Sequence, residues 1–185
     1  MMWLVCLIIL SICSACNSVN NVTIADLRKK ENVNHSRYHT KDITFHGSHI
    51  HGIALHITNR SDEVHWTITA PLAYAFPNQG QGARIHGLVN EVEVEGKIVL
   101  FDLPNVDTPF EYVLASAQEH KAVGCIIVVA PNKNAKQTAI DISIKVETDK
   151  SIRQGYHPQF DLLEEISKFP TVVVDWDGGE RLKNR

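Results

Sequence analysis

The sequence predicts an α+β fold: a mixed sheet that contains one strand–helix–strand (βαβ) unit and a few flanking helices. Two continuous apolar runs, residues 98–101 and 125–129, suit strands that are covered on both faces. Between the two runs, apolar residues recur at helical spacing at Phe110, Val113 and Leu114. A strand–helix–strand order implies a right-handed crossover between parallel strands.

The first 16 residues are similar to a secretory signal peptide. Residues 3–12 form an apolar run, and the small residues Ser14 and Ala15 follow it, as at a cleavage site. The run is shorter than the roughly 18 apolar residues of a membrane span, so we expect no span in the mature chain. A lipoprotein signal ending at Cys16 is the weaker alternative, because Cys13 stands where such a signal prefers Leu. We therefore predict a secreted protein, or one in the lumen of the secretory pathway or of a vacuole.

Residues 17–42 are polar, and we interpret them as a lead-in to one domain of residues 43–185. Early in this domain, apolar and polar residues alternate over residues 50–57 and 64–68, with a polar turn at residues 59–62. Alternation on both sides of a polar turn predicts a hairpin with one buried face.

Four later segments complete the predicted elements. Residues 70–83 contain two prolines and two glycines, which predicts a turn-rich segment on the surface. Alternating apolar residues over 140–146 predict an edge strand, and the apolar run at 169–175 predicts a buried strand. Asp177 followed by Glu180 has the chemistry of an N-cap residue and its N3 partner, which predicts a helix that starts at Arg181 and Leu182.

Composition excludes several kinds of partner and of covalent framework. The net charge is −3 and the basic residues are scattered, which gives no footprint for nucleic acid or an anionic membrane. Cys6, Cys13 and Cys16 lie in or at the edge of the predicted signal peptide, so no disulfide framework is expected. Cys125 lies in an apolar run, and we interpret it as a buried small hydrophobic residue rather than a reactive thiol.

Ten histidines raise the hypothesis of a metal site, and eight of them lie between His35 and His86. His49 and His51 would project to the same face of a strand, as two ligands of a zinc site do. The sequence shows no third ligand at a diagnostic spacing, no HExxH motif and no CxxC pair. We therefore predict no metal and no cofactor, and keep a histidine-rich metal-binding protein as an alternative.

No group of residues points to catalysis. The Asp-Thr-Pro sequence that starts at Asp107 begins like the Asp-Thr-Gly of an aspartic protease, but Pro replaces the glycine and there is no second copy. Asp102 ends a predicted strand, and the carboxyl edge of a sheet is a common place for a binding site. We name Asp102, Asn105 and Asp107 as candidate binding residues, together with the long connection of residues 131–168. We predict that the chain is not an enzyme.

Three N-glycosylation sequons follow the predicted signal peptide, at Asn21, Asn34 and Asn59. They predict a glycoprotein if the source is a eukaryote. Asn59 is the best placed, because it lies in a polar turn.

Three segments of the chain resemble the protease-associated (PA) domain family. Residues 96–102, GKIVLFD, are similar to the family's GKIVLVDR strand, and residues 110–124 resemble its F-x-x-K…AQ…GA-x-G helix and turn. Residues 169–182, with FPTVVV and DGGERL, resemble its P-x-V-x-I…DG-x-x-L element. The resemblance covers about residues 85–182.

The resemblance implies a swivelling β/β/α module of the kind found in secreted or luminal parts of proteases, sorting receptors and membrane-anchored ubiquitin ligases. Such modules have no catalytic residues and are thought to gate substrate access or to bind peptide segments. The family's Arg-Gly-x-Cys after the first strand is replaced here by residues 103–106, LPNV, and its helix lysine by Val113. The basic corner and the disulfide of the family are therefore not expected here.

These observations together predict a secreted or luminal, non-catalytic module of PA type. It would bind a protein or peptide ligand, a protease domain included, or gate the access of substrate to a protease. The alternative is the amino-terminal part of a truncated or degenerate secreted metallo-aminopeptidase or subtilase, since residues 71–74 and the following Gly-rich stretch also resemble the lead-in to a PA domain in metallo-aminopeptidases.

Overall fold

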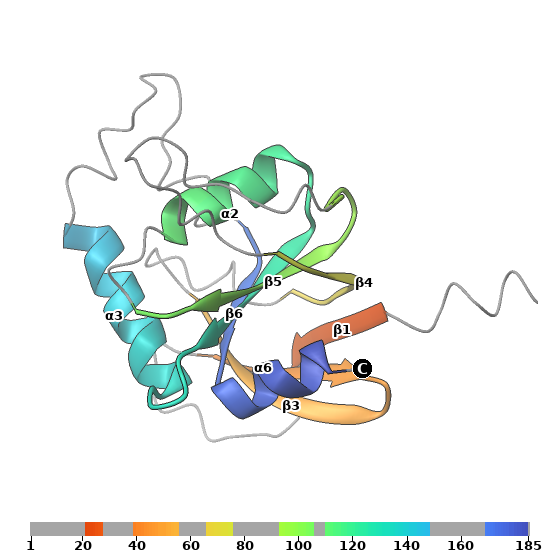
Figure 1. Ribbon diagram of the computed structural model, residues 1–185, viewed down its shortest axis with the longest axis horizontal. Coiled ribbons are helices and arrows are strands. Elements are labelled where there is room, and N and C mark those ends of the chain that lie inside the picture. The colour runs from red at the N-terminus through yellow and green to blue at the C-terminus, as the bar shows by residue number, and fades with distance from the viewer. Residues whose placement is uncertain are drawn as a thin grey trace, which may run out of the picture.

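In the computed structural model, seven strands close into a barrel (Figure 1). The structure describes residues 21–27, 39–55, 66–75, 93–105, 110–148 and 169–184. In chain order the elements are β1 (Asn21–Asp26), β2 (Thr40–Phe45), β3 (Ser48–Ala54), β4 (Ile68–Tyr74), β5 (Ile98–Leu103), α2 (Phe110–Glu119), β6 (Gly124–Val129), α3 (Ala135–Thr148), β7 (Thr171–Val174) and α6 (Trp176–Lys183).

The strands follow one another around the barrel in the order β1, β2, β3, β7, β6, β5, β4. The pairs β4–β5, β5–β6 and β6–β7 are parallel, and the other four pairs are antiparallel. Four neighbouring strands therefore run in one direction, and their carboxyl ends meet at one end of the barrel.

The predicted fold class, an α+β domain of the swivelling PA type, is wrong, because the described residues form a closed mixed barrel with three short helices. Closure depends on β1, which lies within residues 17–42, the segment predicted to be a polar lead-in. Ile24 of β1 is opposite Ile43 on one side and Ile68 on the other, so β1 joins β2 to β4.

The strand–helix–strand unit predicted from the two apolar runs is present as β5, α2 and β6. β5 and β6 are parallel, with Leu100 opposite Ile126. The stripe predicted on the intervening helix is buried, with Phe110 and Leu114 fully inaccessible to solvent. The sequences of β5 and β6 are continuous apolar runs because one face of each strand lines the barrel interior and the other face is covered by helices.

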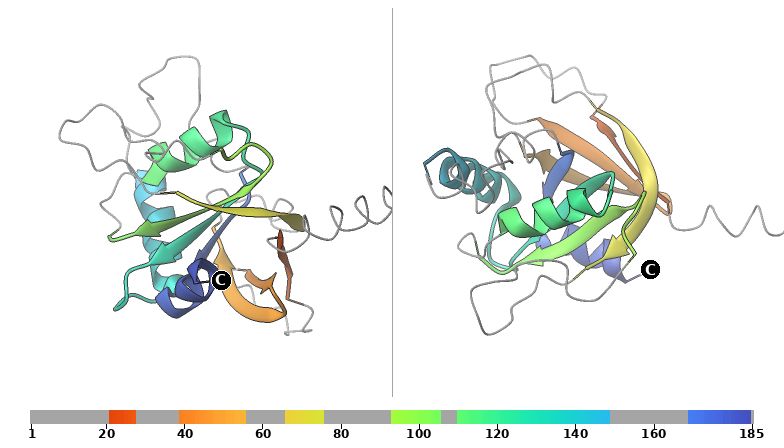
Figure 2. Two further views of the ribbon diagram at one scale, coloured as in Figure 1. Left: turned by 45° about the vertical axis from the view of Figure 1, so that its right-hand side comes forward. Right: turned by 90° about the horizontal axis from the view of Figure 1, so that it is seen from above.

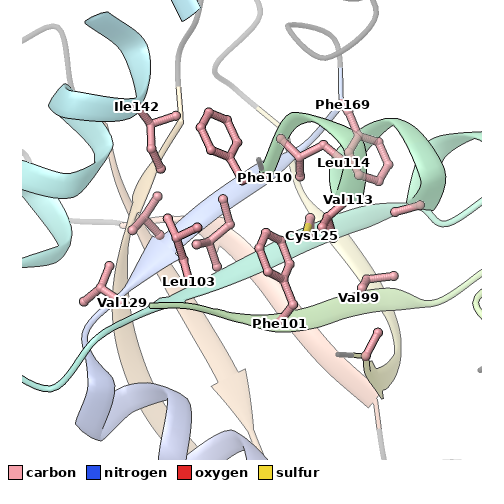
Figure 3. Packing of buried hydrophobic residues seen from close by; sticks show 14 of the residues in the cluster. Val99, Phe101, Leu103, Phe110, Val113, Leu114, Cys125, Val129, Ile142 and Phe169 are labelled. Carbon is pink, nitrogen blue, oxygen red and sulfur yellow. The ribbon is translucent and has the colours of Figure 1, made fainter. Parts of the chain in front are cut away.

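The barrel has one hydrophobic core inside and a second outside. The inside core includes Ile43, Leu100 and Ile126. The outside core lies between the sheet of β5, β6 and β7 and the helices α2 and α3 (Figure 3). Cys125 belongs to the outside core, where burial raises the pKa of its thiol, so its interpretation as a buried small residue is confirmed.

The predicted hairpin between residues 50–57 and 64–68 is wrong. β3 forms its hairpin with β2 and pairs with β7 on the other side. His46 and Gly47, with φ of 48° and 73°, form the two-residue turn between Phe45 and Ser48. Two successive positive φ values are what a tight hairpin turn needs, and they bring β3 back against β2.

Residues 70–83 were expected to form a turn-rich surface segment, but their first part belongs to β4. Pro71 pairs with Asn21 of β1, whereas Leu72 pairs with Ile98 of β5. Pro71, which has no backbone N–H to donate, thus lies where β4 changes from its antiparallel to its parallel neighbour.

The edge strand predicted over residues 140–146 is wrong, because these residues lie inside helix α3. The buried residues of this helix recur at helical spacing, at Ala135, Ala139 and Ile142. Burial of this helical face stabilises the helix, and the alternation of the isoleucines in the sequence has no structural counterpart. Asn134 starts the helix by accepting a hydrogen bond from the backbone N–H of Gln137 at 3.1 Å.

Helix α6 follows β7 directly and closes the end of the barrel where the parallel strands finish. Leu182 is buried in the inside core, and a Cβ on Gly178 would lie 2.8 Å from Ile50 Cγ2. The helix starts at Trp176, with Asp175 as its N-cap residue, and so begins earlier than the helix expected from Arg181 and Leu182 with Asp177 as the cap. In the left view of Figure 2, α2 lies above the strands and α6 lies below them, on the side of the inside core.

The predicted signal peptide and the sequons at Asn34 and Asn59 lie outside the described residues. The domain boundary at residue 43 stays a prediction, although β1 and the start of β2 precede it. None of the helices in the described ranges has the length and apolar character needed to cross a membrane.

The close approach of α6 to the barrel predicts that Gly179→Ala destabilises the fold. A Cβ at this position would overlap Val128 Cγ1, and the resulting overpacking costs about 1–3 kcal/mol. This loss exceeds the gain of about 1 kcal/mol that Ala brings to a helix. Urea denaturation measures the difference, with the exposed Arg181→Ala as a control that changes stability by less than about 0.5 kcal/mol. An unfolding midpoint of Gly179→Ala at or above that of the unmodified chain would contradict the packing.

Candidate functional site

Asp102 lies at the carboxyl end of β5, as predicted, and its two oxygens contact side chains from two other elements. The Tyr74 hydroxyl of β4 donates a hydrogen bond of 2.5 Å to Asp102 Oδ2. The Lys183 ammonium of α6 lies 2.5 Å from Asp102 Oδ1. The Tyr74 distance is typical of a hydrogen bond from a hydroxyl to a carboxylate, and the Lys183 contact is a close ion pair. The carboxylate therefore joins strand β4, strand β5 and the helix that closes the barrel.

The Lys183 ammonium is surrounded by acidic and aromatic groups. It donates a hydrogen bond of 3.0 Å to Glu180 Oε1 of the same helix. It also lies 4.6 Å from the ring centroid of Trp176 and 5.2 Å from that of Tyr74, both within cation–π range. Its side chain is only 12% exposed. We call these five residues, Tyr74, Asp102, Trp176, Glu180 and Lys183, the carboxyl-end cluster.

The cluster keeps its two proton donors protonated at neutral pH. Burial and the Asp102 carboxylate together raise the pKa of Tyr74 to about 12. Burial alone would lower the pKa of Lys183, but its hydrogen bonds to Asp102 and Glu180 outweigh burial and raise it. Neither group is thus tuned for proton transfer near neutral pH.

The three predicted binding residues have different outcomes. Asp102 is half-buried in the cluster, and Asn105 is exposed three residues later, just beyond the end of β5. Asp107 lies outside the described residues, as do residues 149–168 of the predicted binding connection. No sequence pattern pointed to Tyr74 or Lys183, because both come from segments far from Asp102 in the chain.

A second polar cluster lies at the opposite end of the barrel. Lys41 of β2 points inward with Ile43, and its side chain is fully buried. Its ammonium lies 2.5 Å from Asp26 Oδ1, donates to the Trp66 carbonyl at 3.1 Å, and lies 4.2 Å from the centroid of the Trp66 ring. Burial lowers the pKa of Lys41, and the pairing with Asp26 opposes that effect. Because it is enclosed, this lysine serves to close the end of the barrel rather than to meet a ligand.

Two further expectations concern glycosylation at Asn21 and a metal site. Asn21, the first residue of β1, is exposed, whereas the hydroxyl of Thr23 in the same sequon forms a hydrogen bond of 2.9 Å with that of Thr69. Within the described ranges, no group of three or more His, Cys, Asp or Glu side chains is placed to hold a metal ion.

Comparison of the chain with protein-family models, with curated proteins and with solved structures gives no match. The function therefore has to be argued from the arrangement of the side chains.

The raised pKa of Tyr74 predicts a loss of stability in alkali. The folded state holds the Tyr74 proton more tightly than the unfolded chain does. Its contribution to the free energy of unfolding is therefore fully present below about pH 10 and is lost as the pH rises through about 12. The tyrosinate absorbance is titrated in the unmodified chain and in Tyr74→Phe, and the difference between the two curves reports the ionisation of Tyr74 alone. Asp102→Asn removes the carboxylate, so we expect the pKa of Tyr74 to move down toward its ordinary value. A titration of Tyr74 that Asp102→Asn leaves unchanged would contradict the contact.

We predict that substitutions of Lys41 and of Asp26 have different effects on the stability of the fold. Lys41→Met replaces a buried ammonium by an apolar chain of similar length and leaves the half-exposed Asp26 to water, so we expect unchanged or higher stability. Asp26→Ala removes the carboxylate that the buried ammonium pairs with, and we expect a loss of about 1–3 kcal/mol. Urea denaturation of both variants checks the contrast. A larger loss for Lys41→Met than for Asp26→Ala would be evidence against this role.

Proposed function

We propose that this chain is a secreted or luminal, non-catalytic module that binds an extended peptide segment of another protein at the carboxyl end of the barrel. The segment carries a basic side chain, and a segment of a protease domain is one such ligand. The carboxyl-end cluster provides the contact surface, together with the exposed residues Pro104 and Asn105 beyond β5.

The observation that carries the proposal is a set of half-exposed aromatic and acidic side chains held in fixed positions. Tyr74, Trp176 and Glu180 are each partly accessible, and the Lys183 ammonium holds all three through a hydrogen bond and two ring contacts. Aromatic side chains dominate the energy of many protein interfaces. Groups that are already ordered lose little conformational entropy when a ligand binds.

The charges of the cluster favour a basic ligand. Two carboxylates, Asp102 and Glu180, face one ammonium, Lys183, which leaves an excess of one negative charge. A lysine or arginine of the peptide would complement that charge, and its long apolar stem would pack along the Trp176 ring.

Binding accounts for the chemistry of the cluster better than catalysis does. Tyr74 and Lys183 retain their protons at neutral pH, and both oxygens of Asp102 already have a partner. The sequence resemblance to PA domains also supports a binding role, because residues 96–102, which carry Asp102, are part of it. The swivelling fold that this family implied is not part of the proposal.

A peptide-library selection tests the proposal. We expect selected peptides to be enriched in Lys or Arg, and Trp176→Ala to weaken their binding by about tenfold or more, as for an interface anchor. Asn105→Ala, which leaves the cluster intact, should weaken binding by a smaller factor. The control is Glu95→Gln, an exposed residue paired with Lys121 at the amino end of β5. The proposal fails if Trp176→Ala, folded by circular dichroism, binds the selected peptides as tightly as Glu95→Gln does.

A further inference from the structure

The carboxyl-end cluster holds an amine and a carboxyl group in contact at a partly enclosed place. The Lys183 ammonium lies 2.5 Å from Asp102 Oδ1, and the two side chains are 12% and 29% exposed. The carboxyl carbon of Asp102 is one C–O bond beyond that oxygen, so it lies at most about 3.7 Å from Lys183 Nζ. Reacting atoms that are held about 3–3.5 Å apart are close to the geometry of bond formation.

Two further side chains of the cluster are placed to assist a reaction between these groups. Glu180 Oε1 accepts a hydrogen bond of 3.0 Å from the same Nζ atom, so a proton can pass between them. The Tyr74 hydroxyl donates a hydrogen bond of 2.5 Å to Asp102 Oδ2. Attack on the carboxyl carbon would place negative charge on that oxygen, where the hydroxyl would stabilise it. The cluster thus contains a nucleophile, an electrophile, a proton acceptor and an oxyanion donor.

We propose that Lys183 and Asp102 form an amide bond with each other, which joins helix α6 covalently to strand β5. The reaction modifies the chain itself, since each molecule reacts once and water is the only other product. The proposal goes beyond peptide binding and does not depend on it. The bond consumes one carboxylate and one ammonium, so Glu180 keeps the excess negative charge of the cluster.

The reaction is a condensation in which no group is oxidised or reduced. Lys183 first gives a proton to Asp102 Oδ1, which leaves a neutral amine beside a neutral carboxylic acid. The Nζ lone pair then attacks the carboxyl carbon, and the π electrons move to Oδ2, where the Tyr74 hydroxyl stabilises them. Glu180 takes a proton from Nζ and gives it to Oδ1, which leaves as water while the C=O bond at Oδ2 forms again.

The fixed contact between the two groups makes this bond feasible although both groups are charged at rest. Burial lowers the pKa of Lys183, but its contacts with Asp102 and Glu180 outweigh burial and raise it, so the neutral amine is a minor state and the reaction is slow. Well-oriented groups within one molecule have effective concentrations that reach about 10⁵–10⁸ M, which offsets that low population. The rings of Tyr74 and Trp176 lie against the amine and limit the access of water that would hydrolyse the bond.

The bond would change what holds the helix at the end of the barrel. Until it forms, α6 is held by packing and by charge contacts alone and can leave the barrel. Once it has formed, α6 stays tethered to β5 even when its packing is lost. A link between residues far apart in the chain also closes a long loop, which lowers the entropy of the unfolded state and raises the thermal midpoint.

Intact-mass spectrometry of the denatured full chain tests the bond. After prolonged incubation at neutral pH, we expect the unmodified chain to be lighter by one water molecule than its sequence requires. Lys183→Arg keeps the positive charge but removes the primary amine, so it should retain its full mass. A protease digest of the unmodified chain should contain a branched peptide that joins the segments of Asp102 and Lys183.

Variants of the assisting groups distinguish the reaction from simple packing. We expect Glu180→Gln to slow the loss of water by about 100-fold or more, because the amide does not take up a proton at neutral pH. Tyr74→Phe removes the oxyanion donor and should slow the loss by about 100-fold. Asp102→Asn has ammonia as its leaving group, so the bond in this variant should be accompanied by loss of ammonia in place of water.

Lys121→Arg is the matched control. Lys121 Nζ lies 3.1 Å from Glu95 Oε1, but both of these side chains are well exposed, so this variant should lose water as the unmodified chain does. Full mass of the unmodified chain would overturn the proposal, as would a loss of water that persists in Lys183→Arg. The Lys41 ammonium is also 2.5 Å from a carboxylate oxygen, that of Asp26. A branched peptide at this pair in place of the one at Lys183 would overturn the assignment.

Discussion

Closure of the barrel by β1 is the constraint on which the rest of the structure depends. β1 has six residues and pairs with β2 on one side and β4 on the other. Its inward side chains, Val22 and Ile24, are fully buried in the inside core. Without β1, the facing edges of β2 and β4 would expose unpaired backbone groups, which favour association with other chains. Closure also places Trp66, just before β4, against Lys41 of β2.

Local patterns were sufficient for part of the fold and failed where long-range pairing decides. β5, α2 and β6 could be predicted because two buried strands and an amphipathic helix each have a distinct local signature. β1 could not, because Asn21–Asp26 has only two fully buried residues, Val22 and Ile24, inside a largely polar segment. Over residues 140–146, the isoleucines alternate as in a strand, yet in the helix that forms Ile142 is buried against the sheet and Ile144 is exposed.

The same limit applies to the contacts between side chains. The position of Asp102 at a strand end was predictable, whereas its partners Tyr74 and Lys183 are brought to it by strand pairing and by the packing of α6. A shared face for His49 and His51 follows from strand geometry alone. The hydrogen bond between His49 and Asp42 depends on the register of the hairpin, and His46 at the positive-φ turn position is not the Asn or Asp that would have marked that turn in the sequence.

The two adjacent glycines of α6 have a consequence for the order of folding. A helix of eight residues is marginal in water, and each glycine lowers its intrinsic stability by a further ~1 kcal/mol. α6 can therefore persist only against a barrel wall that is already formed by Val128, Val174 and Ile50. These residues come from β6, β7 and β3, three strands that are remote from one another in the chain, and such strands pair slowly because long loops must close first. We therefore expect the closing helix to be the last element to form and the first to leave, so that the carboxyl end of the barrel opens before the barrel itself unfolds.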